Sequence, residues 1–141
     1  QSNPDKLVNH FIKKTYVYSN DKVSEQKESE YSITNASVLV DKKWQPISID
    51  EQKKLAWKTI NDPSTLPLST TESKFNYQSG QILITKNKYS FSNRVKNGKT
   101  EQNKELLSSE SIKFTLDSSG KAIKKETTDQ NRKIEIQEFH Y

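Results

Sequence analysis

Few residues in this chain could carry out nucleophilic or acid–base chemistry. Its 141 residues include no cysteine and only two histidines, His10 and His140. A nucleophilic triad needs a serine or threonine beside a histidine that is oriented by an acid. His10 is predicted to lie on a helix beside its apolar stripe, and His140 is the penultimate residue, where chains tend to fray. The sequence therefore indicates no nucleophilic site.

Metal and cofactor sites are not indicated either. Two distant histidines without a cysteine match no zinc-ligand spacing. Asp21, Glu25, Glu28 and Glu30 are close in sequence, but lysines interleave them and the central glycine of a calcium loop is missing. Three glycines cannot build a glycine-rich phosphate loop. We expect no metal, no cofactor and no enzymatic activity, although the paired carboxylates of a glycosidase have no fixed sequence spacing that could be tested.

The positive charge is concentrated in one segment. The net charge is +5, and residues 71–100 contain six basic residues with Glu72 as their one acidic residue. Tyr89 and Phe91 alternate with polar residues, as in a strand with one buried face. The cations in the opposite phase would share the solvent side, and we predict a partner-binding surface there, formed by Lys86, Lys88, Arg94 and Lys96. A strand that lysines keep soluble and unpaired is the alternative.

Trp57 is the second candidate for contact with a partner, because it lies off the apolar stripe of its predicted helix. An exposed tryptophan in a short helix can anchor a protein partner, and packing against a sheet is the alternative. The basic segment suits an acidic protein or an anionic cell-surface polymer. Nucleic acid fits less well, because its binding usually also needs exposed aromatic side chains, and those of the basic segment are predicted to be buried.

Two helices are predicted to help position these residues. Residues 1–18 should form a helix and then a short strand, because the Asn-Pro-Asp at 3–5 is typical of a helix start and an apolar helical stripe follows. Ser48 and Glu51 form a capping box, which predicts a second helix over 48–62.

The remainder is predicted to consist of strands and loops. Residues 73–141 read as an antiparallel meander, with a strong turn signal at Asn97-Gly98. Apolar alternation is clearest around Phe114, which we expect in the core. Residues 19–30 and 100–110 are mostly polar and are predicted to be loops.

The elements favour one domain spanning residues 1–141. The predicted class is α+β, with the N-terminal helix and one further short helix packed on a curved antiparallel β-sheet, in a cystatin-like or half-barrel fold. A mostly-β lipocalin-like barrel is the alternative. No apolar run approaches the roughly 20 residues of a membrane span.

These observations predict a non-enzymatic binding domain of an exported or surface-tethered bacterial protein. The chain begins at Gln1 instead of a methionine, so we expect a signal or lipid-attachment segment to precede it. A carrier of a small apolar ligand, held in a cavity between sheet and helix, is one alternative. A nucleic-acid-binding module is another.

Overall fold

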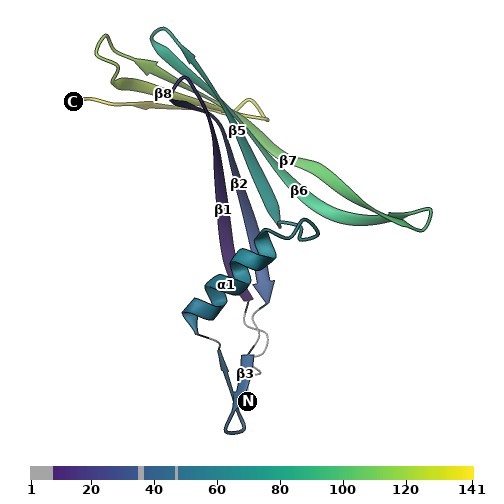
Figure 1. Cartoon of the computed structure of the whole chain (residues 1–141). Helices are drawn as coiled ribbons and strands as arrows, with labels where there is room; N and C mark the ends of the chain where they lie inside the picture. The colour runs from purple at the N-terminus through teal and green to yellow at the C-terminus, as the bar shows by residue number, and fades with distance from the viewer. Residues whose placement is uncertain (1–7, 35–36, 47) are drawn as a thin grey trace.

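The fold is mostly β. The computed structural model describes residues 8–34, 37–46 and 48–141. In chain order the elements are β1 (Val8–Ser19), β2 (Lys22–Thr34), β3 (Ser37–Val40), β4 (Lys43–Pro46), α1 (Ile49–Ile60), β5 (Ser69–Gln78), β6 (Gln81–Lys96), β7 (Lys99–Leu116), β8 (Ala122–Asp129) and β9 (Ile134–Glu138). Seven strands form one antiparallel sheet in the order β1-β2-β5-β6-β7-β8-β9, and β3 pairs with β4 in a separate hairpin (Figure 1).

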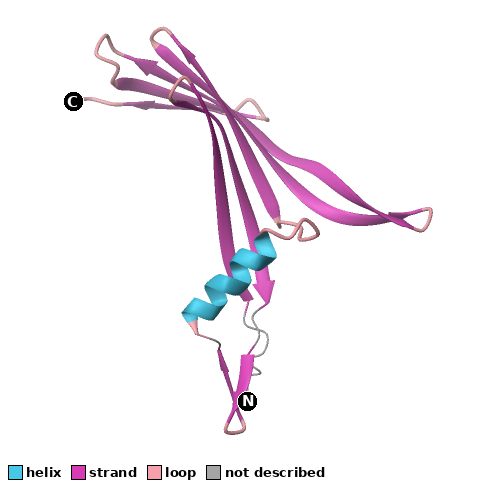
Figure 2. Ribbon diagram, in the orientation of Figure 1, coloured by secondary structure: helices cyan, strands magenta, loops and turns pink. Residues whose placement is uncertain are grey.

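The predicted α+β class with two helices is wrong. Within the described residues there is one helix, and the seven-stranded sheet has β1 and β9 as its two edges. The mostly-β alternative is closer, but this sheet stays open and does not close into a barrel (Figure 2).

The helix predicted within residues 1–18 is wrong where that segment is described, because β1 occupies it. β1 pairs with β2 from Val8 to Ser19. Phe11 and Ile12, neighbours on the predicted helical stripe, therefore point to opposite faces of the sheet. Phe11 packs beneath α1, whereas the side chain of Ile12 is 57% exposed.

The loop predicted at residues 19–30 is also wrong, since most of it belongs to β2. Asn20 and Asp21 make the connecting turn, with φ angles of 51° and 63°. A two-residue type I′ hairpin needs a positive φ at both positions, and Asn and Asp tolerate it better than most residues. β2 is polar because most of its described side chains are exposed or only partly buried, with Ser29 and Tyr31 as the buried exceptions.

The second predicted helix is present as α1. Ser48 caps it, because its Oγ accepts a hydrogen bond from the Glu51 N–H at 3.2 Å, and Asn61 is the C-cap that follows Ile60. α1 lies against one end of the β1–β2 hairpin (Figure 2). Ala56 is buried there against Tyr31, with Phe11 and Ile60 packed around them.

The predicted meander is formed by β5 to β9, each antiparallel to the next. The loop expected at residues 100–110 is wrong, because β7 runs through it. Asn97 and Gly98 turn the chain between β6 and β7, with φ angles of 53° and 74°. This long hairpin extends beyond its neighbours as an arm (Figure 1).

Two faces of the sheet can be distinguished by the strand register. We call the side on which α1 lies the helix face; it carries Phe11, Tyr31 and Thr70. The opposite side, the open face, carries Ile84 and Ile112, which lie directly opposite one another on β6 and β7.

Burial is sparse on both faces. The buried apolar residues of the described part are Tyr31, Ala56, Ile84 and Ile112. The expectation that Phe114 forms the core is wrong, because it is only partly buried. Among the described elements no second layer covers the open face, so Phe114 has neighbours in its own sheet alone.

Candidate functional site

The four predicted partner-binding cations share the open face but are not together. On β6 they alternate with Tyr89, which points to the helix face. Lys86 and Lys88 pair with both β5 and β7, whereas Arg94 and Lys96 pair with β7 alone, on the β6–β7 arm. Arg94 is six positions beyond Lys88, which corresponds to about 20 Å along an extended strand. The structure thus separates the predicted surface into two regions.

Lys86 and Lys88 line a groove of about 340 Å³ across β6, β7 and the end of β8. Glu110 lies opposite Lys86 in the register, and Asp129 lies opposite Glu110. Both acidic residues also line the groove. Two cations and two carboxylates leave no excess positive charge, so the groove is poorly suited to bind a simple anion.

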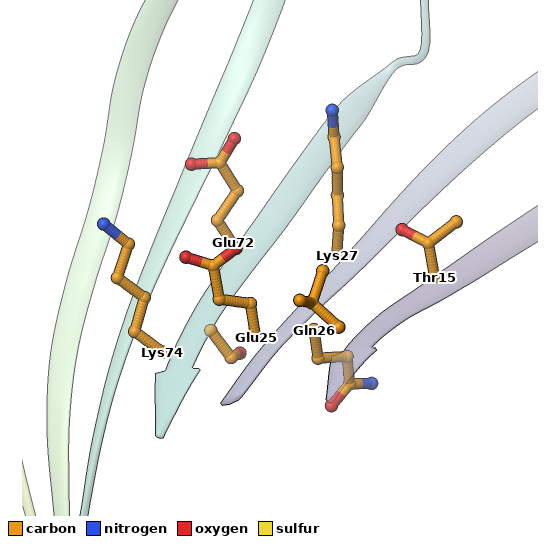
Figure 3. Close-up of a pocket in the computed structure, with 8 residues that line it drawn as sticks. Thr15, Glu25, Gln26, Lys27, Glu72 and Lys74 are labelled. Atoms are coloured by element: carbon orange, nitrogen blue, oxygen red, sulfur yellow. The ribbon is translucent and has the colours of Figure 1, made fainter. Parts of the chain in front are cut away.

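A smaller groove of about 240 Å³ lies over β1, β2 and β5. Figure 3 shows its charged side chains, Glu25 and Lys27 from β2 and Glu72 and Lys74 from β5. Each carboxylate lies opposite a lysine in the register, Glu25 with Lys74 and Lys27 with Glu72. Opposite charges across neighbouring strands stabilise one register over others. The four side chains form a ladder of alternating charge, and Glu72 also makes an ion pair with Lys104, whose Nζ lies 3.1 Å from Glu72 Oε1.

The two histidines lie at opposite edges of the sheet. His10 is exposed on β1, and His140 follows β9, with its Nε2 3.6 Å from Glu138 Oε2. Within residues 8–34, 37–46 and 48–141 no three His, Cys, Asp or Glu side chains are grouped so that they could hold a metal ion.

Four charged groups away from these grooves have shifted pKa values. The Ser119 hydroxyl and the Lys121 backbone N–H lower the pKa of Asp117 by hydrogen bonding. The backbone N–H and hydroxyl of Ser64 lower the pKa of Asp62 in the same way. The hydrogen bonds that these two carboxylates accept stabilise the tight turns in which they lie.

The other two shifted groups form an ion pair on β8. Lys124 Nζ lies 2.7 Å from Glu126 Oε1. The hydrogen bond raises the pKa of Lys124 and lowers that of Glu126. A mutual shift of this kind is typical of an ion pair on the surface of a sheet.

Trp57 lies in a third groove, between α1 and β1, with a volume of about 380 Å³. Its side chain is 67% exposed. Packing of Ala56 against Tyr31 fixes the rotation of α1 and turns Trp57 outward. Phe11, Ala56, Trp57 and Ile60 give the groove an apolar lining. An exposed tryptophan beside apolar neighbours is the usual composition of an anchor point for a protein partner.

Lysines surround this apolar lining. Lys13, Lys14 and Lys53 line the groove, and no acidic residue is among its lining residues. Lys13 Nζ donates a hydrogen bond to Asn61 Oδ1 at 3.1 Å, which links β1 to the end of α1. Lys14 Nζ lies 3.4 Å from Glu28 Oε1. Among the described residues, no ion pair is seen for Lys53. The groove is therefore both apolar and positively charged.

β1 adds an unpaired strand edge to the groove. Its 12 residues pair with β2 on one side, and within the described residues no strand pairs with the other side. Tyr16, Val17 and Tyr18 are between 47% and 65% exposed. A long, exposed and apolar edge strand is a template for pairing with another chain. We call β1 and the α1–β1 groove together the edge groove.

The sequence singled out Trp57 but assigned most of β1 to a helix. The β-prone Tyr16-Val17-Tyr18 indicated only a short strand at the end of that segment. The outer edge itself could not be recognised, because strand order depends on contacts between distant segments.

Comparison with known proteins adds no assignment: no family model, curated protein or solved structure matches this chain. None of the helices in the described part is both long and apolar enough to cross a membrane.

Proposed function

We propose that this chain is a non-enzymatic binding domain and that the edge groove is where it binds a protein partner. The observation that carries the proposal is Trp57, 67% exposed in an apolar groove beside a 12-residue strand edge. Tryptophans in such positions contribute disproportionately to binding free energy. An open sheet edge supplies backbone hydrogen bonds, and a neighbouring groove supplies side-chain selectivity.

The expected partner segment is extended and acidic. An added strand would satisfy the outward N–H and C=O groups of β1, and one of its apolar side chains would fill the groove beside Trp57. Lys13, Lys14 and Lys53 surround that position, and the β1 sequence contains no acidic residue. Carboxylates on the partner strand would meet these cations, which favours association and selects against basic segments.

Self-pairing of β1 is disfavoured by the same lysines. In a symmetric antiparallel pair centred on Lys13 or on Lys14, that lysine would lie directly opposite the same lysine of the other copy. Like charges directly opposite one another destabilise a strand pair. The edge groove is therefore better suited to a different chain than to a second copy of β1.

The two alternative functions have less support from the geometry. A carrier needs a cavity that encloses most of its ligand, whereas the grooves described above lie on the surface of an open sheet. Nucleic acid needs excess positive charge, and Glu110 and Asp129 offset Lys86 and Lys88 in the central groove.

A pair of synthetic peptides tests the proposal. The first alternates glutamate with valine and carries one central leucine; the second replaces every glutamate by lysine. Isothermal titration calorimetry should show binding of the acidic peptide and none of the basic one. Trp57→Ala should weaken binding by about 2 kcal/mol, or roughly 30-fold. Leu107→Ala, which truncates a 49% exposed side chain on the distant β7, should leave the affinity unchanged.

A second pair of variants isolates the charge. Lys53→Glu reverses a lysine that lines the groove, and Lys54→Glu reverses its neighbour, which does not. The first should weaken binding of the acidic peptide several-fold more than the second. Equal effects, or equal binding of the acidic and basic peptides, would contradict the proposal.

A further inference from the structure

The open face carries an apolar cluster that no described element covers. On neighbouring strands β5, β6 and β7 it consists of Phe75, Tyr77, Ile82, Ile84, Ile112 and Phe114, which we call the open-face cluster. The rings of Phe75 and Tyr77 stack with their centroids 6.4 Å apart. Tyr77 remains 37% exposed, and only the two central isoleucines are buried. A sheet with an apolar face normally packs against a second layer.

The strand register makes this face self-complementary. Ile82 lies opposite Phe114, Ile84 opposite Ile112, and Lys86 opposite Glu110, in three successive rows across β6 and β7. Consider a two-fold axis that runs parallel to the strands, midway between β6 and β7, in front of the open face. Such an axis places each β6 residue of one copy over its β7 register partner in the other copy.

We propose that a second copy of this chain covers the open-face cluster in this symmetric, face-to-face arrangement. Ile84 would then pack on Ile112 of the other copy and Ile82 on its Phe114, with the sheets about 10 Å apart as in a β-sandwich. The contact is isologous, because every interaction occurs twice.

Charge complementarity identifies the second copy as the occupant. The rotation that pairs the isoleucines also places Lys86 over Glu110 of the other copy, twice.

A uniformly charged partner would fit this face less well. Lys86 and Glu110 are side by side, so an acidic surface would face Glu110 and a basic one would face Lys86. A complementary surface must place an acidic group over Lys86 and a basic group over Glu110. A second copy related by the two-fold axis places its Glu110 and Lys86 in those positions.

Analytical ultracentrifugation of the intact chain tests the proposal. Sedimentation equilibrium of the wild type should give twice the chain mass of 16.3 kDa. Lys86→Glu and Glu110→Lys should each weaken the dimer at least tenfold, because each homodimer then contains two like-charged contacts. An equimolar mixture of the two variants should dimerise again, since every intermolecular pair is then attractive.

The mixture separates an interface effect from a folding effect. Each variant also has a like-charged pair within its own sheet, and mixing does not change that pair. Rescue in the mixture can therefore come only from contact between copies. Circular dichroism should show the same strand content for both variants. A wild type that stays at 16.3 kDa up to millimolar concentration, or a dimer that neither reversal weakens, overturns the proposal.

Discussion

The hydroxyl pair between Ser29 and Thr70 should stabilise the junction of β2 and β5. Ser29 Oγ and Thr70 Oγ1 lie 2.9 Å apart on the helix face. Thr70 is 0% exposed and Ser29 6% exposed, so neither hydroxyl has easy access to water. Thr70→Val keeps the shape of the side chain and removes its hydroxyl. Ser29 would then be a buried polar group without this partner, which costs about 1–3 kcal/mol.

A double-mutant cycle gives the coupling between the two hydroxyls. Ser29→Ala should cost a similar amount, because it leaves the Thr70 hydroxyl without its partner. The double variant removes both polar groups, so its loss should be smaller than the sum of the single losses by about 1–2 kcal/mol.

Urea denaturation followed by circular dichroism measures these free energies of unfolding. Thr85→Val is the matched control, because Thr85 lies on the same face of β6 but is exposed; it should change stability by less than about 0.5 kcal/mol. Additive single losses, or a loss with Thr70→Val no greater than the control, would refute this account of the junction.

Three further predictions concern the helix cap, the open face and a turn. Ser48→Ala should lower stability by about 1 kcal/mol in urea denaturation, because the Glu51 N–H loses its acceptor; no loss would mean that α1 does not depend on its cap. At protein concentrations low enough for the chain to be monomeric, Phe114→Ala should cost about 2 kcal/mol, less than the 3–5 of a fully buried phenylalanine, and a loss that stays in that higher range on dilution would contradict a partly buried Phe114 in the monomer. Hydrogen bonds lower the pKa of Asp117 in the folded state. The ionised carboxylate therefore stabilises the fold above the ordinary pKa of 3.8, and this stabilisation is lost as the pH falls through the lower pKa of the folded state. The stability difference between wild type and Asp117→Asn should therefore shrink below pH 3.8, and a difference that grows on acidification would contradict the sign.

Local signals in the sequence predicted the elements that depend on local chemistry. α1 follows from the Ser48–Glu51 capping box, because the cap is formed within four residues. The Asn97-Gly98 turn follows from the ease with which both residues take a positive φ. These features need no knowledge of what packs against them.

The polar strands could not be predicted in the same way. Strand patterns are recognised by alternation between a buried and an exposed face. The outer half of β7 is mostly exposed, and the buried side chains in the described part of β2 are limited to Ser29 and Tyr31. Burial therefore imposes little alternation on either segment. β1 carries an apolar spacing that fits a helix equally well, and its pairing with β2 decides the outcome.

The sequence could identify one residue of the candidate site, but it could not predict which other residues lie beside it. Trp57 could be singled out, since it lies off the apolar stripe of a capped helix. Its neighbours Phe11 and Lys13 come from a strand about 45 residues away, and only the fold brings them together. The same limit applies to Lys86, whose position opposite Glu110 depends on the β6–β7 register.

Amide hydrogen exchange tests most directly whether a partner strand adds to β1. Two-dimensional NMR spectra should be recorded for the chain alone and saturated with the alternating glutamate–valine peptide. We expect the outward-facing amides of β1 to exchange at least about tenfold more slowly in the complex, while those of β9 at the other edge stay unchanged. Protection confined to β9, or a bound peptide that protects no amide of β1, would contradict binding at the edge groove.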